Sequence, residues 1–74
     1  MRPVEIRPTK KFRGGWVAFE GPGVEPVFAG PNGKQDAINY ARGRFGGGSG
    51  EIRVYDDAGE TVVETIEIED DRYG

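Results

Sequence analysis

Apolar and polar residues alternate along several stretches of the chain, and this two-residue period is typical of strands with one buried face. Val4–Arg7 and Glu51–Tyr55 alternate in this way. Trp16–Glu20 and Glu60–Glu69 are predicted as further strands, and a short apolar run at Pro26–Ala29 adds another. Proline has no backbone N–H to give to a ladder. Pro8 therefore predicts that the first strand ends there or lies at a sheet edge.

The second predicted strand has apolar residues on both faces. Trp16, Ala18 and Glu20 share one face, whereas Val17 and Phe19 share the other. Trp16 has two interpretations. It is either a core residue beside the helix or an exposed platform on which a nucleic-acid base could stack, and we favour the core.

A helix is expected between the third and fourth strands. Asn32 is a good N-cap residue, and Gln35 follows three positions later, where it could complete a capping box. Spacings of three and four residues then predict one apolar stripe, formed by Ala37, Ile38, Ala41 and Phe45. The glycine-rich run 46–50 ends the helix.

The last two strands are expected to form a hairpin. Residues 56–59 read Asp-Asp-Ala-Gly, which favours a tight turn with glycine at a positive φ. In the last strand Val62, Ile66 and Ile68 are expected on one face, which Glu64 interrupts.

The order β-β-β-α-β-β predicts an α+β fold, a two-layer sandwich with one helix packed on a mainly antiparallel sheet. The 74 residues form a single small domain, 1–74, and residues 70–74 are an acidic tail that we expect to fray. We expect five residues in the core, namely Trp16, Ile38, Ala41, Ile52 and Val54.

Composition excludes much chemistry. The chain has no cysteine and no histidine, so it lacks thiolate metal ligands, disulfides and the usual general base near neutral pH. Gly33-Lys34 lacks the rest of a phosphate-loop motif, and a hairpin turn explains Asp56 and Asp57 better than a calcium loop does. We therefore expect no enzyme, no catalytic residue, no bound metal and no cofactor.

Charge is divided unevenly along the chain. Residues 1–50 carry eight Lys/Arg and four Asp/Glu, whereas residues 51–74 carry two Arg and nine acids. The first part could form a local basic patch for nucleic acid, made of Lys10, Lys11, Arg13, Arg42 and Arg44. The net charge of −3 opposes such binding, so a nucleic-acid-binding module is the alternative interpretation.

One helix can cover only one face of the sheet. Apolar residues on the other face, with Val17, Phe19 and Tyr55 as candidates, would then need a partner. We therefore expect a small interaction domain that binds itself as a homodimer or binds another protein.

The motifs resemble a small bacterial family known as domain of unknown function 2188. Its G-G-W-x-V strand resembles the run 14–18, its F…K-x-x-A-I-x-x-A-R helix resembles Phe28 with residues 34–42, and its closing hairpin resembles residues 51–59. The last strand is longer and more acidic than this family implies. The resemblance implies the fold and carries no activity.

A looser similarity is to antitoxins of the HicB type, which pair with a small RNA-cleaving toxin. The shared outline is a strand containing G-x-W, a short strand and a helix with alanines four residues apart, here Ala37 and Ala41. The chain has no apolar run of the roughly 20 residues needed to span a bilayer and no apolar stretch of a signal peptide after Met1. We expect a cytoplasmic location.

Overall fold

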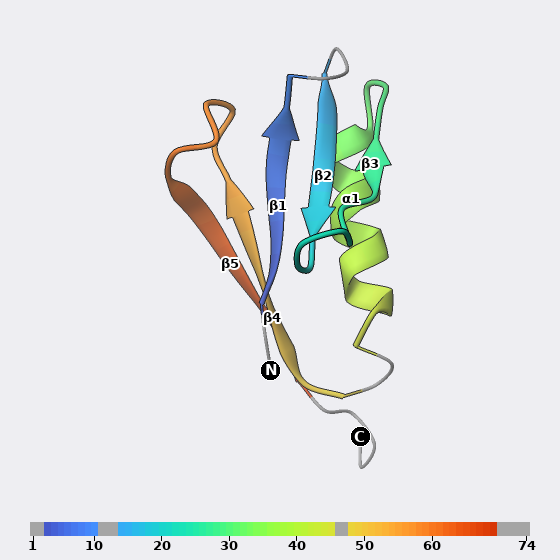
Figure 1. Ribbon diagram of the computed structural model, residues 1–74. Helices are drawn as coiled ribbons and strands as arrows, with labels where there is room; N and C mark the ends of the chain where they lie inside the picture. Colours follow the sequence, from blue (N-terminus) through green and yellow to red (C-terminus); the bar gives the residue numbers. More distant parts are fainter. Residues whose placement is uncertain (1–2, 11–13, 46–47, 70–74) are drawn as a thin grey trace.

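The computed structural model describes residues 3–10, 14–45 and 48–69 (Figure 1). Its elements, in chain order, are β1 (Val4–Thr9), β2 (Gly15–Phe19), β3 (Val27–Phe28), α1 (Gly33–Gly43), β4 (Gly50–Tyr55) and β5 (Val62–Ile68). The predicted order β-β-β-α-β-β is confirmed, and each element overlaps its expected range.

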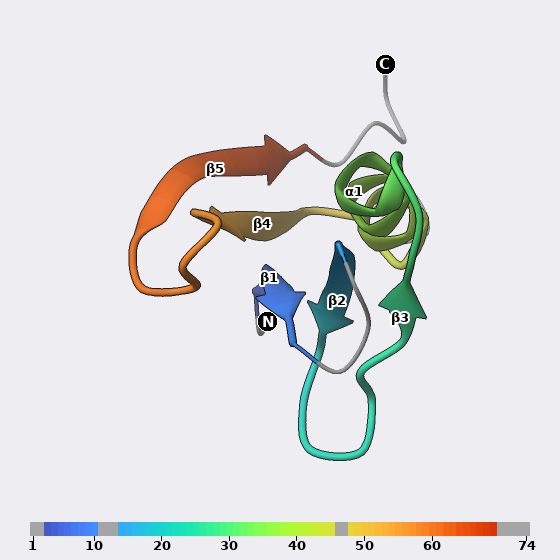
Figure 2. The same ribbon diagram turned by 90° about the horizontal axis from the view of Figure 1, so that it is seen from above.

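The five strands form one sheet in the order β3-β2-β1-β4-β5. All neighbouring strands are antiparallel except β1 and β4, which run parallel. The helix α1 packs mainly on β2 and β3 and covers one face of the sheet (Figures 1 and 2). The predicted two-layer α+β sandwich with a mainly antiparallel sheet is thus confirmed. Within the described residues, no helix is long and apolar enough to cross a membrane.

The core lies between α1 and the strands beneath it. All five residues predicted for the core are buried, and Trp16, the most exposed of them, keeps only 9% of its surface accessible. The buried set is completed by Val4, Ile6, Ala18 and Ala37. Small residues on both layers let the helix approach the sheet closely: Ala37 and Ala41 of α1 and Ala18 of β2 are all fully buried.

The helix ends earlier than its apolar stripe suggests. Its last residue is Gly43, and the backbone N–H of Arg44 donates to the carbonyl of Ala41. Phe45 follows the helix and still packs against the core. Its ring lies over Gly50, the first residue of β4, where a side chain would collide with it.

The predicted capping box is wrong. Asn32 holds the N-cap position, but no side-chain hydrogen bond caps the helix. Gln35 instead donates from Nε2 to Oδ1 of Asn39, one turn further along the exposed face, at 3.1 Å. Residues four positions apart are neighbours on a helix surface, so this contact competes with the cap for the Gln35 amide.

The expectation for Pro8 is also wrong. Pro8 lies inside β1, opposite Trp16, and β1 occupies the centre of the sheet. The register explains why this is tolerated, because the β1–β4 ladder runs only from Val4 to Ile6. At Pro8 the strand has already passed its last partner in β4, so that side of the ladder needs no N–H there.

The faces of β5 differ from the prediction at one residue. The ladder with β4 is irregular between Val54 and Tyr55, and Val62 lies opposite Tyr55. Because paired residues share a face, Val62 lies on the side away from α1, whereas Glu64, Ile66 and Ile68 lie on the helix side. One extra residue in a strand moves the side chains on its far side to the opposite face of the sheet. The prediction assumed an unbroken two-residue alternation, and for that reason it placed Val62 on the wrong face.

Candidate functional site

The side of the sheet turned away from α1 has no covering layer among the described residues (Figure 2). We call this side the open face. The registers of the ladders place the following side chains on it: Glu5, Arg7, Val17, Phe19, Val27, Glu51, Arg53, Tyr55, Val62, Thr65 and Glu67. All three residues predicted for the sheet face, Val17, Phe19 and Tyr55, are therefore on one surface.

Arg7 lies at the centre of the open face, between two aromatic side chains. Its guanidinium carbon lies 5.3 Å from the ring centre of Phe19 and 5.0 Å from that of Tyr55, so one cation contacts two aromatic rings. Such contacts are attractive because the face of an aromatic ring is electron-rich. Arg7 also forms an ion pair with Glu5, which accepts a hydrogen bond from the Tyr55 hydroxyl at 3.3 Å.

Sequence reasoning missed Arg7 and Glu5. The alternation of residues 4–7 already placed both on one face of β1. What was lacking was the strand order, because only a central β1 brings Arg7 between Phe19 of β2 and Tyr55 of β4.

Valines extend the open face beyond Arg7. Val17 lies opposite Arg7 in β2, and Val27 of β3 lies opposite Val17. Val27 keeps 39% of its surface exposed. A hollow of about 300 Å³ lies beside these two valines, and Thr9 of β1 together with Gly23 and Glu25 of the loop between β2 and β3 completes its wall. The open face thus combines apolar contact area with a depression that a partner's side chain could fill.

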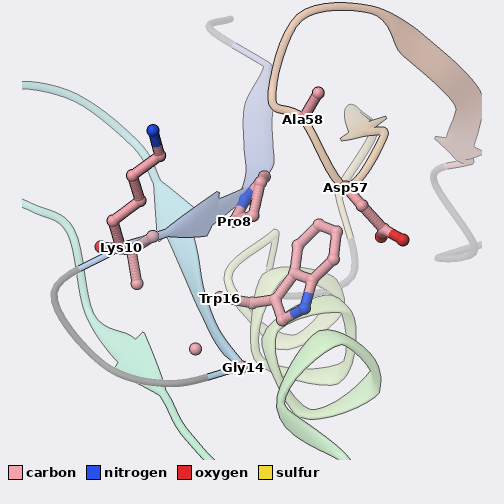
Figure 3. A pocket seen from close by; sticks show the side chains of 8 residues that line it. Pro8, Lys10, Gly14, Trp16, Asp57 and Ala58 are labelled. Carbon is pink, nitrogen blue, oxygen red and sulfur yellow. The ribbon is translucent and has the colours of Figure 1, made fainter.

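A second hollow, of about 360 Å³, lies near Trp16 (Figure 3). Pro8 and Trp16 form its apolar part, while Lys10 and Asp57 stand at different sides of its rim. The ammonium of Lys34 lies 5.2 Å from the centre of the indole ring. Because Trp16 is nearly buried, little of the indole is left for a base to stack on, and its side chain is part of the core.

The described members of the predicted basic patch do not converge. Lys10 borders the hollow at Trp16, near the start of α1, whereas Arg42 and Arg44 lie at the end of that helix. A helix of 11 residues spans roughly 16 Å. The other two members, Lys11 and Arg13, lie outside the described residues.

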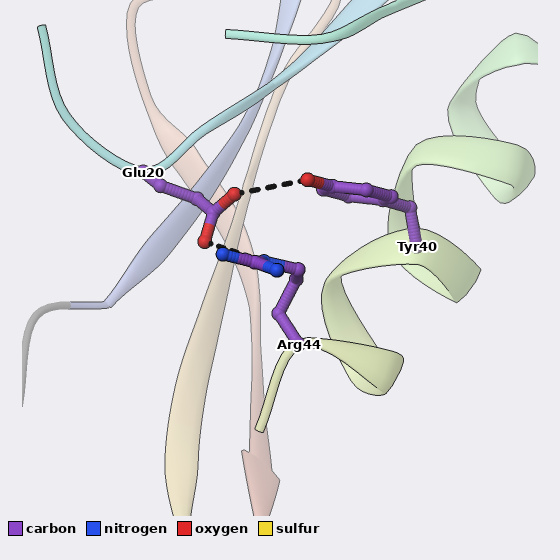
Figure 4. A network of polar contacts seen from close by, with 3 residues as sticks. All are labelled: Glu20, Tyr40 and Arg44. Carbon is purple, nitrogen blue, oxygen red and sulfur yellow. Dashed lines mark hydrogen bonds and ion pairs between the residues drawn. The ribbon is translucent and has the colours of Figure 1, made fainter. Parts of the chain in front are cut away.

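Arg44 is engaged within the domain (Figure 4). Its Nε donates to Oε1 of Glu20 at 3.0 Å, and the hydroxyl of Tyr40 donates to Oε2 of the same carboxylate at 3.1 Å. The hydrogen bond to Glu20, together with the negative charge of that carboxylate, raises the pKa of Arg44 above its ordinary value. These contacts tie the C-terminal end of α1 to the loop after β2.

The acidic turn between β4 and β5 is a structural feature. Oδ1 of Asp56 accepts backbone hydrogen bonds from Glu60 at 3.0 Å and Thr61 at 3.4 Å, and Gly59 adopts a φ of 73°. The hydrogen bond from Glu60 is the main cause that lowers the pKa of Asp56 below its ordinary value of 3.8. The predicted tight turn is confirmed. In the described part of the chain, no group of three acidic side chains is placed to hold a metal ion.

Comparison of the chain with protein-family models, curated proteins and solved structures gives no match. The resemblances to domain of unknown function 2188 and to HicB-type antitoxins therefore stay predictions.

Proposed function

We propose that this domain is a non-enzymatic binding module of the cytoplasm, and that it associates with a second copy of itself through the open face. The observation that carries the proposal is the cluster of Phe19 and Tyr55 around Arg7 on a sheet face that α1 does not cover. The lack of histidine and cysteine supports a binding role over a catalytic one.

The charges of the open face favour a copy of the same surface as partner. A two-fold interface brings one surface against itself, so it has to be self-complementary. The open face carries cations, Arg7 and Arg53, beside the acids Glu5 and Glu51. A rotated copy can set each cation near an acid while the aromatic rings and valines pack between them.

The size of the domain is compatible with such an interface. A standard interface buries about 800 Å² on each partner, and the chain exposes 5091 Å² in all. An interface of this size would take about one sixth of that surface.

The mass in solution, measured by light scattering over a concentration series, tests this proposal. We expect the mass of a dimer for the parent chain and of a monomer for Phe19→Glu, which places a charge among the clustered rings. Asn39→Glu is the matched control, because Asn39 is exposed on the helix at the other side of the domain. A parent chain that stays monomeric up to about millimolar concentration, well above the affinity of an ordinary specific interface, would refute the proposal.

The alternative of nucleic-acid binding receives less support from the described residues. Arg44 is held by Glu20, and Lys10 lies away from it. An antitoxin-like role beside a small toxin is a second form of protein binding, which the same open face could serve.

A further inference from the structure

The last strand, β5, forms one edge of the sheet. It has seven residues, whereas β3 at the opposite edge has two. Within the described residues β5 pairs with β4 alone, so the backbone groups on its other side are available to an added strand (Figure 2). Proteins usually protect a long edge from such pairing with lysine, proline or a bulge.

β5 is only partly protected against such pairing, and the charged side chains that it carries are all negative. The bulge affects only the start of the strand, at Val62 and Val63. From Val54 to Glu69 the sequence has six acids and no lysine, arginine or proline. Glu64 is turned to the helix side and Glu67 to the open face, so negative charge borders the edge on both sides.

The acids of β5 have no cationic partner in the part of the chain that the structure describes. Among the described residues neither Glu64 nor Glu67 forms an ion pair, and Glu67 lies directly opposite Glu51 of β4. Like charges in direct opposition destabilise a ladder. Arg53 forms an ion pair with Glu51, and no lysine or arginine within residues 3–10, 14–45 and 48–69 pairs with Glu67.

Apolar side chains lie between these charges. Val62 and Val63 are 39% and 59% exposed, and Ile66 and Ile68 are only half-buried at the margin of the core. An added strand would extend the sheet and cover them, and alternate side chains of that strand would face the two sides of the sheet.

We propose that the free edge of β5 binds an extended segment of another protein by strand addition, and that this segment carries lysine or arginine alternating with apolar residues. Main-chain hydrogen bonds supply affinity in this mode of recognition, and side chains supply specificity. The acids of β5 favour a basic segment and disfavour a second β5, which would bring more negative charge to the same edge. The proposal concerns the backbone edge of β5, which borders the open face, and it does not depend on the proposed dimer.

A synthetic peptide tests this inference. The probe alternates lysine and valine over seven residues, the length of β5, and is titrated against the parent chain and against Phe19→Glu. Using both proteins separates this test from that of the dimer. We expect binding that weakens with salt, and slower hydrogen exchange at alternate backbone amides of β5 when peptide is bound.

Matched variants and a matched peptide define the outcomes. Glu67→Gln should weaken binding about two- to five-fold, the range for one exposed ion pair. Asp36→Asn, at an exposed position of α1, should leave binding unchanged. A peptide with N-methyl groups on alternate residues keeps its charge and loses backbone donors, so it should not bind. Equal binding of both peptides, or unchanged exchange in β5, would overturn the proposal. The proposal would also be overturned if the β5 strands of two copies paired with each other and this pairing displaced the peptide.

Discussion

The first residue of α1, Gly33, offers a sharp test of how the helix sits on the sheet. A Cβ at Gly33 would lie 2.5 Å from the carbonyl oxygen of Phe28 and 3.2 Å from its carbonyl carbon. These are backbone atoms of β3, which is paired with β2, so they cannot rotate away as a flexible side chain would. Gly33→Ala therefore forces the start of α1 away from β3.

The expected effect is the sum of two opposed contributions. In an unstrained helical position, replacing glycine by alanine stabilises a protein by about 0.4–1 kcal/mol, because it restricts the unfolded chain. Overpacking of a close contact costs about 1–3 kcal/mol, and here the contact is with backbone. We expect Gly33→Ala to lower the free energy of unfolding by about 1–2 kcal/mol.

Gly43, the last residue of the same helix, supplies the matched control. A Cβ there would meet nothing within 4 Å, and its φ is not in the left-handed region. Gly43→Ala should therefore be neutral or stabilise the domain by up to about 1 kcal/mol. Thermal unfolding followed by circular dichroism should show a lower Tm for Gly33→Ala, by about 4–8 °C for each kcal/mol in a domain of this size. If Gly33→Ala melts with or above Gly43→Ala, the start of α1 does not lie against the Phe28 carbonyl.

Three further predictions concern the core, the turn and the charge of the surface. Ile38 is 6% exposed, so Ile38→Ala should lose about 2–5 kcal/mol of stability, measured by urea denaturation; a midpoint equal to that of the parent would show that this helix face is not the buried one. The pKa of Asp56 is lowered on folding by the hydrogen bonds that it accepts, chiefly from Glu60, so the stability it provides is fully present above its unfolded pKa and is lost as pH falls through the folded value. The parent should accordingly be more stable than Asp56→Asn at neutral pH, and this difference should shrink below about pH 3.8; a constant difference between the two melting temperatures across the acid range would contradict the linkage. With a net charge of −3, the domain should bind random nucleic acid no more tightly than about micromolar at physiological salt, and sub-micromolar affinity in a fluorescence-anisotropy titration would revive the basic-patch interpretation.

Local periodicity was enough to predict the elements and most of the core. The stripe of Ala37, Ile38 and Ala41 and the alternation of Ile52 with Val54 each place buried residues correctly, because burial on one face leaves a period in the sequence. The turn at residues 56–59 is equally local, since it needs only an acceptor side chain and a glycine.

Each wrong prediction depended on contacts with another strand or side chain, which a local sequence pattern does not encode. Pro8 is tolerated in a central strand because the β1–β4 ladder stops before it, and a ladder's length is a property of two strands. Gln35 had two possible partners, and the sequence does not rank them. The bulge that reverses Val62 leaves no mark in the order of apolar residues.

The candidate site was predicted only in part for the same reason. Val17, Phe19 and Tyr55 were identified because one helix covers only one face of the sheet, and these residues stand on the face opposite the predicted core residues of their strands. The cation that joins them, Arg7, became visible only when the sheet order placed β1 between β2 and β4.

The central position of β1 also determines how the chain can fold. Its partner on one side, β2, follows within a few residues, whereas its partner on the other side, β4, comes much later, since Val4 pairs with Ile52. Closing a loop of roughly fifty residues costs about 3 kcal/mol of chain entropy beyond a constant, and contacts of such separation slow folding. During synthesis the hairpin of β1 and β2 can form early, but the edge of β1 stays unpaired until β4 has been made. A chain interrupted before Gly50 would keep that edge exposed and would therefore be prone to aggregate.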